Sequence, residues 1–124
     1  MEFLHGIERT AADLVVSKST CDSFYRTDLQ SVLSNADVRE LLICGWATDY
    51  CVDTTVRAAA SREYSITIVA DGHTAASRPH LDAATIIRHH NITWADLLVP
   101  AEPIRILTAD EIARQRFGQP GDAR

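Results

Sequence analysis

A cysteine at the start of a predicted helix is the residue of this sequence with the clearest capacity for chemistry. Cys51 lies in the stretch GWATDYCV, residues 45–52, which follows the apolar run Leu41 to Cys44. An apolar run closed by a glycine is typical of a buried parallel strand, and the alanine-rich segment after Asp49 predicts a helix. The unpaired N–H groups and positive dipole end of a helix favour a thiolate over a thiol. Cys51 is therefore a candidate nucleophile, and the alternative is a buried structural cysteine.

The expected position of Cys51 suits attack on a carbonyl carbon. It would lie at the carboxyl end of a strand, which is the edge where open α/β sheets bind ligands. The carbonyl oxygen becomes an oxyanion as the thiol adds, so it needs N–H donors about 3 Å away. The backbone amides of Ala47 and Cys51 are placed to offer them, so we predict that these two residues form the oxyanion hole.

Strands and helices are expected to alternate along the chain. The predicted strands are 14–17, 40–44, 65–71 and 97–99, and the predicted helices are 27–33, 49–62, 79–90 and a terminal helix that starts at Thr108. This order is typical of an α/β fold with three layers, in which helices cover both faces of a mostly parallel sheet. The sequence has no internal repeat and no low-complexity linker, so we expect residues 1–124 to form a single domain.

The composition excludes several classes of partner. The formal net charge is −5 with no block of like charges, so nothing favours nucleic acid or an anionic membrane as a partner. No apolar stretch approaches the roughly 18 to 20 residues of a membrane span, and the sequence has no signal-peptide pattern, so we expect a cytoplasmic location. The three cysteines lack CxxC spacing, and the adjacent His89 and His90 point to different helix faces. We therefore expect no metal site and no cofactor.

Three segments carry a family resemblance. Gly45 to Ala59 resembles the signature G-x-x-T-D-x-C-V-x-x-T-x-R-x-A of the isochorismatase-like cysteine hydrolases, which include nicotinamidases and N-carbamoylsarcosine amidases. Lys18 to Leu29 is similar to a second family element, a lysine at a strand end followed by S/A-F and then T-x-L. Ile66 to Thr74 is similar to a third, a strand that ends in an aspartate before a polar loop. Together these cover roughly Asp13 to Ile112.

The resemblance implies roles for individual residues. It implies that Cys51 is the nucleophile and Lys18 its cationic partner, and that a cis peptide bond before Ala47 turns an N–H toward the oxyanion. The aspartate that serves as general acid and base in this family lies on an earlier strand, in a D-x-Q context that this sequence does not contain. Asp13 precedes a predicted strand and lacks the glutamine. The chain therefore resembles the carboxyl-terminal part of a family member, an amino-terminally incomplete domain that lacks the first strands.

Other side chains near the motif have more than one interpretation. Phe24, Trp46 and Tyr50 are candidate walls of a substrate pocket, because aromatic rings stack on planar amides, and each could equally belong to the core. Asp49 is predicted to be a charge at the start of the helix and Asp71 the cap of a loop. We expect Thr55 and Arg57 to fix the helix against its neighbours.

The leading hypothesis is a cysteine hydrolase that cleaves an amide or other C–N bond of a small molecule through a thioester on Cys51. The alternative is a non-catalytic fragment or pseudoenzyme that serves as a binding or assembly module. Hydrolysis of the isochorismate vinyl ether is a weaker hypothesis, because that reaction does not use a cysteine nucleophile. The strand that ends at Gly45 would have an open apolar edge, which predicts a homo-oligomer.

Overall fold

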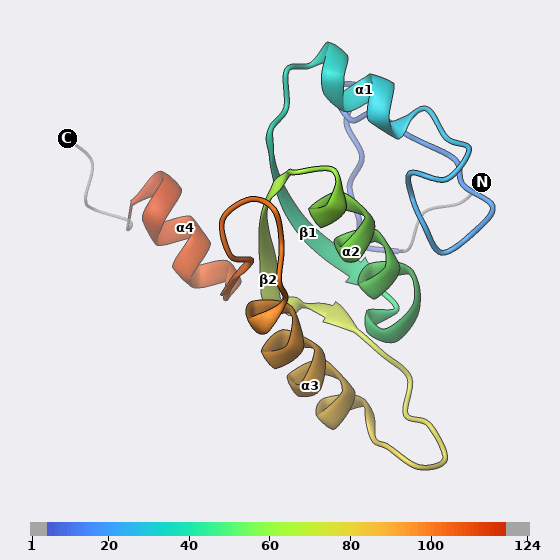
Figure 1. The fold of residues 1–124 in the computed structure, drawn as a ribbon, viewed down its shortest axis with the longest axis vertical. Coiled ribbons are helices and arrows are strands. Elements are labelled where there is room, and N and C mark those ends of the chain that lie inside the picture. Colours follow the sequence, from blue (N-terminus) through green and yellow to red (C-terminus); the bar gives the residue numbers. More distant parts are fainter. Residues whose placement is uncertain (1–4, 119–124) are drawn as a thin grey trace.

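The computed structural model describes residues 5–118. Figure 1 shows a short parallel sheet with helices packed around it. In chain order the elements are α1 (Leu29–Asn35), β1 (Glu40–Trp46), the π-helical turn η1 (Thr48–Val52), α2 (Asp53–Ser61), β2 (Ser65–Thr74), α3 (Ala83–Asp96), β3 (Arg105–Leu107) and α4 (Ala109–Phe117).

The sheet has the strand order β1-β2-β3, and both pairings are parallel. The connection from β1 to β2 contains α2 and that from β2 to β3 contains α3, as parallel neighbours require. The expected α/β fold with a parallel sheet is confirmed. Because β1 is at the edge in this order, its second side has no strand partner within residues 5–118.

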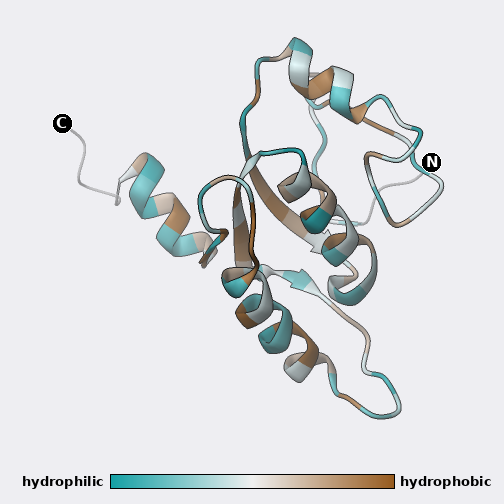
Figure 2. Ribbon diagram, viewed as in Figure 1, coloured by the Kyte–Doolittle hydropathy of each residue, from teal (hydrophilic) through white to brown (hydrophobic). Residues whose placement is uncertain are grey.

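Alternation along the strands divides the sheet into two faces. Leu41 and Ile43 of β1 lie beside Ile66 and Ile68 of β2 in the register, and all of them belong to or pack against the main core cluster. The Thr67 side chain points to the opposite face of the sheet from Ile66 and Ile68 and is also buried. Strand β2 is therefore covered on both faces. Helix α4 contacts β2, and its Arg116 forms an ion pair with Glu40 of β1. By the strand register, Glu40 lies on the same face of the sheet as Thr67. Figure 2 shows the apolar colouring concentrated on the strands and on the inner sides of the helices.

Trp94 of α3 connects two helices through the core. Its ring is fully buried, and its Nε1 donates a hydrogen bond of 2.8 Å to Oδ1 of Asp53 at the start of α2. Buried indole N–H groups need such a partner, since an unpaired donor would carry the full desolvation cost. This bond therefore fixes the start of α2 relative to α3.

Several predicted boundaries were wrong. The segments 14–17 and 97–99 are not strands, because no described strand lies beside them to complete a ladder, and the last strand is β3. The first described strand continues through Gly45 to Trp46, with a register shift between Ile43 and Gly45. The predicted helix from Pro79 starts later, where Asp82 accepts a hydrogen bond from the N–H of Thr85.

The first and last helices show how well cap residues were predicted. The predicted Thr108 cap of α4 is confirmed, because its side chain accepts from the N–H of Glu111. Helix α1 begins at Leu29, with Asp28 rather than Thr27 at the cap position. No helix among residues 5–118 has the length and apolar character needed to cross a membrane.

His73 is a buried histidine at the end of β2 with both ring nitrogens engaged. Nδ1 lies 2.8 Å from Oγ1 of Thr48, and Nε2 lies 2.8 Å from Oδ1 of Asn91. Asn91 donates its own amide to the carbonyl of Ala70, which orients its oxygen toward His73. The neutral imidazole thus fits a site with one donor and one acceptor. Burial lowers the pKa of His73, against the opposing effect of Asn91.

We predict that stability falls with acidification because of His73. Its pKa is lower in the folded chain than in the unfolded chain, so the unfolded state binds the proton more readily as the pH drops below about 6.5. Urea unfolding between pH 7 and pH 5 should show this loss, and the His73→Leu variant should lose that part of the pH dependence. The variant should also be less stable at pH 7 by about 1–3 kcal/mol, because Thr48 and Asn91 lose a partner.

A control for this prediction is the exposed His89, whose substitution by leucine should leave the pH dependence as in the parent chain. Equal pH profiles for the parent and His73→Leu chains would contradict the prediction.

The open edge of β1 is a possible surface for self-association. Leu42 is 45% exposed and Trp46 is 63% exposed, although both lie on a strand. Unpaired edges with apolar side chains invite pairing with another chain. We predict that the 124-residue chain self-associates, and light scattering after size-exclusion chromatography should give a mass above that of the monomer.

Charge placed on β1 should oppose this association. The Leu42→Lys variant is expected to move toward the monomer mass, whereas Leu98→Lys, at a fully exposed leucine outside the sheet, should not. A compact monomer with cooperative unfolding in the parent chain would show that the edge is not a binding surface.

Candidate active site

The carboxyl end of β1 and the start of α2 bring Cys51 to the edge of the sheet. Gly45 has a φ of 136°, a conformation that favours glycine, and the peptide bond between Trp46 and Ala47 is cis, as the family resemblance implied. The chain then enters η1, with Cys51 within this turn and α2 directly after it. The Cys51 side chain is half-buried, so its sulfur stays accessible to a small molecule.

Lys18 contacts Cys51 directly. Its Nζ lies 3.3 Å from Sγ of Cys51 and donates a second hydrogen bond of 2.9 Å to the carbonyl of Thr20. The predicted proximity of these two residues is confirmed, although Lys18 follows a segment that is not a strand. The contact places a positive charge where a thiolate would carry its negative charge.

Thr55 holds the loop that carries Lys18. Its hydroxyl donates to the carbonyl of Cys21, at 3.1 Å, and accepts from the backbone N–H of Ser23, also at 3.1 Å. The Ser23 hydroxyl lies 2.9 Å from the same oxygen. The sequence indicated a structural role for Thr55 but not its partners, because contacts across more than 30 positions leave no local pattern. Ser23 was missed for the same reason.

A pocket of about 200 Å³ opens beside the sulfur. Its lining residues come from the Lys18 loop, the end of β1 and the start of α2: Lys18, Ser23, Ile43, Cys44, Gly45, Trp46, Cys51, Val52 and Thr55. None of these described residues has a carboxyl group. The pocket can therefore offer a nucleophile and a cation, but it offers no acid or base of the aspartate type.

The three predicted aromatic wall residues lie in different places. Trp46 lines the Cys51 pocket. Tyr50 lines a neighbouring pocket of about 280 Å³, where the Arg78 guanidinium lies 4.6 Å from the centre of its ring. Phe24 does not line the pocket, because its ring is buried in the core and stacks on Tyr64 with 6.0 Å between ring centres.

Asp49 lies in the first turn of η1, as the sequence suggested, whereas Asp71 lies within β2 and does not cap the loop after it. Both carboxylate oxygens of Asp49 accept from Arg78, at 2.9 and 3.0 Å, which holds the loop after β2 against η1. The hydrogen bonds from Arg78 lower the pKa of the Asp49 carboxyl. Asp71 accepts from the N–H of Ala109 at the start of α4. No pattern in the sequence indicated that Arg78 would bind Asp49.

The histidines do not converge on a common point. Within residues 5–118 no group of three or more His, Cys, Asp or Glu side chains is arranged to hold a metal ion. Both ring nitrogens of His73 are hydrogen-bonded, to Thr48 and Asn91, and Nδ1–H of His90 donates to the carbonyl of Ile86.

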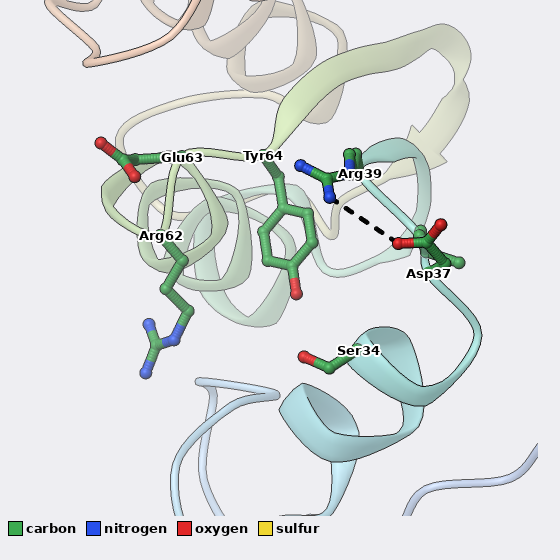
Figure 3. A pocket seen from close by; sticks show the side chains of 7 residues that line it. Ser34, Asp37, Arg39, Arg62, Glu63 and Tyr64 are labelled. Carbon is green, nitrogen blue, oxygen red and sulfur yellow. Dashed lines mark ion pairs between the residues drawn. The ribbon is translucent and has the colours of Figure 1, made fainter.

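A larger pocket, of about 410 Å³, lies at the opposite end of the sheet. Figure 3 shows it between the end of α1, the start of β1 and the end of α2, with an exposed ion pair of 3.8 Å between Arg39 and Asp37. It contains neither a cysteine nor a lysine. The residues suited to covalent chemistry are therefore gathered at the Cys51 pocket.

Comparison with known proteins identifies the family of this chain. The isochorismatase domain model matches residues 1–94, so the chain belongs to the isochorismatase family. A ureidoacrylate amidohydrolase, RutB, of Methylorubrum extorquens is 35% identical over 74 residues, which are 60% of this chain and 30% of RutB. A protein of Arabidopsis thaliana named a probable inactive nicotinamidase is 33% identical over 81 residues, 64% of this chain and 41% of that protein.

The fold is also shared with solved structures. A cysteine hydrolase from Pseudomonas syringae pv. phaseolicola superposes with a TM-score of 0.83 at 28% identity, over 92% of this chain and 54% of that one. The chain thus spans about half of the structural relative and less than half of these two curated relatives.

We predict that Cys51 is the most reactive of the three thiols, although Cys21 and Cys44 are more exposed. Alkylation requires the thiolate, and only Cys51 has the Lys18 ammonium as a hydrogen-bond donor among the described contacts. Brief treatment with iodoacetamide at neutral pH, followed by mass spectrometry, should show Cys51 modified first. Trypsin leaves Cys44 and Cys51 on one peptide, residues 40–57, so chymotryptic cleavage after Trp46 and Tyr50 is needed to separate them.

The Lys18→Met variant should remove the preference for Cys51, and Arg88→Met, which deletes an exposed charge on α3, should preserve it. Faster modification of Cys21 or Cys44 in the parent chain would contradict the assignment.

Proposed function

We propose that this chain carries the nucleophilic half of a cysteine hydrolase that cleaves an amide or other C–N bond of a small molecule. The observation that supports this most directly is the 3.3 Å contact between Nζ of Lys18 and Sγ of Cys51 at the mouth of the 200 Å³ pocket. A thiolate beside a fixed ammonium is suited to attack on a carbonyl carbon. Lys18 is the sole lysine of the sequence, so no other ammonium side chain can replace it.

In the proposed reaction the Cys51 sulfur adds to the carbonyl carbon of the substrate. The C–N bond then breaks, the amine leaves with a proton, and the acyl group stays on sulfur as a thioester. Water hydrolyses this thioester to a carboxylic acid and restores the thiol. The backbone N–H groups of Ala47 and Cys51 are proposed to bind the oxyanion, since they lie at the positive end of η1 and α2. Trp46 is proposed as one wall against which a planar substrate stacks.

Amine departure and water activation each need a proton-transferring group. General acid and base groups typically contribute 10²-fold to 10⁴-fold to such steps. The described lining of the Cys51 pocket has no carboxylate to act in this way. Acylation by substrates with good leaving groups is therefore the step that these residues can support unaided.

A second candidate function is that of a non-catalytic binding or assembly module. It is favoured by the same lack of a carboxylate in the described pocket and by the relative named a probable inactive nicotinamidase. The exposed edge of β1 would supply its contact surface. We propose small-molecule binding without nucleic acid or membrane for either function, with a cytoplasmic site of action and assembly into homo-oligomers.

An activated aryl ester tests the acylation step, because its phenolate leaves without protonation. We predict that p-nitrophenyl acetate acylates Cys51 of the 124-residue chain, seen as one added acetyl group on the peptide that contains Cys51. Cys51→Ala should abolish this mass increase, and Lys18→Met should slow it by roughly 10²-fold, the cost of losing one stabilising donor. Arg88→Met serves as the control for loss of a positive charge.

Hydrolysis of a C–N substrate distinguishes the hydrolase from the non-catalytic module. Nicotinamide and a ureido acid are suitable probes, because the names of the relatives include both substrate classes. Acylation by the ester together with ammonia release from either amide would support the hydrolase. Equal ester acylation in the parent and Lys18→Met chains would refute the proposed role of Lys18.

A further inference from the structure

The loop that carries Lys18 holds a thiol that does not line the Cys51 pocket and that the proposed hydrolysis does not use. Cys21 lies on the Lys18 loop, and the hydroxyl of Thr55 holds its carbonyl at 3.1 Å. Thr55 is on α2, which follows directly after the turn that contains Cys51. Lys18 connects the same two segments, because its Nζ contacts both the sulfur of Cys51 and the carbonyl of Thr20. Two independent sets of contacts therefore hold the backbone of the loop that carries Cys21 close to Cys51.

The two thiols also interact with each other. Contact with the Cys51 side chain raises the pKa of the Cys21 thiol, desolvation and the negative charge of Cys51 raise it further, and Lys18 opposes them. Cys21 therefore stays a neutral thiol to a higher pH than an ordinary cysteine does. Cys21 is exposed and Cys51 is half-buried, so an oxidant and a reductant can both reach this pair.

We propose that Cys21 and Cys51 form a reversible disulfide when the protein meets a hydroperoxide, so that Cys21 is the resolving cysteine of a redox-controlled site. This inference rests on the proposed nucleophilic character of Cys51. It extends that role, because the same accessible thiolate that would attack a carbonyl carbon would also attack peroxide oxygen.

The chemistry takes two steps. In the first, the Cys51 thiolate attacks one oxygen of hydrogen peroxide, the O–O bond breaks, and hydroxide leaves. Cys51 becomes a sulfenic acid, and the hydroxide takes up a proton to form water. In the second, the sulfur of Cys21 attacks the sulfenic sulfur, the S–O bond breaks, and a second water forms with the proton of Cys21.

The surroundings favour the second step once the first has happened. Oxidation converts the Cys51 thiolate to a neutral sulfenic acid, which changes the hydrogen bond that raises the pKa of Cys21 and removes the smaller effect of the negative charge. Lys18 stays in place and now favours a thiolate at Cys21. The disulfide blocks acylation, because the Cys51 sulfur is no longer free. It also prevents further oxidation to the sulfinic acid, which dithiothreitol does not reverse.

Peroxide treatment of the full 124-residue chain tests the proposal. The reduced protein is treated with about one equivalent of hydrogen peroxide, blocked with N-ethylmaleimide, and digested with trypsin and chymotrypsin for mass spectrometry. We expect a peptide pair that joins Cys21 to Cys51 within one chain and has lost two hydrogens. Dithiothreitol should return both thiols. A Cys44→Ser variant should form the same disulfide.

The Cys21→Ser variant tests whether Cys21 protects Cys51 from oxidation to the sulfinic acid. Cys21 is exposed, so the exchange for serine should leave the fold intact, which far-ultraviolet circular dichroism checks. With excess peroxide, the fraction of Cys51 that dithiothreitol recovers should fall roughly tenfold relative to the parent chain, with sulfinic acid in its place. Equal recovery in the two chains, a disulfide to Cys44, or a disulfide only between two chains would each overturn the proposal.

This test separates the redox proposal from the hydrolase. Disulfide formation without acylation by the aryl ester would support the switch and contradict the proposed function. Acylation of Cys51 without the disulfide would support the hydrolase and refute the switch.

Discussion

The hydroxyl of Thr55 is the contact on which the geometry of the site depends. The loop from Lys18 to Ser23 belongs to no strand or helix, so it has no backbone ladder to hold it. Thr55 ties it to α2 at the Cys21 carbonyl and the Ser23 amide. Because α2 continues from the turn that carries Cys51, these two bonds keep the ammonium of Lys18 beside the sulfur. A single side chain thus replaces the support that a neighbouring strand would give.

The rigidity of α2 comes from the other side of the helix. Val56 and Ala59 are fully buried against the sheet, and Trp94 donates to Asp53 at the first turn. The Asp49 ion pair with Arg78 holds η1 from outside. Cys51 therefore lies on a well-anchored element, while Cys21 and Lys18 lie on a loop.

Covalent catalysis and redox sensitivity draw on the same physical property. A sulfur that carries negative charge beside an ammonium is a good nucleophile toward carbonyl carbon, and it is equally open to peroxide. In the proposed switch, attack by the Cys21 thiol on the oxidised Cys51 would make that oxidation reversible.

The sequence by itself determined the α/β class and the position of Cys51 after a strand, because hydrophobic periodicity carries that information, and its family resemblance implied the pairing of Cys51 with Lys18. It did not determine which segments are strands at the sheet margins. Residues 14–17 and 97–99 are apolar enough, but a strand also needs a neighbour, and only the tertiary structure decides where one is present. Burial of Phe24, the Thr55 contacts and the approach of Cys21 to Cys51 were decided there too, since each joins residues more than 25 positions apart through packing of side chains.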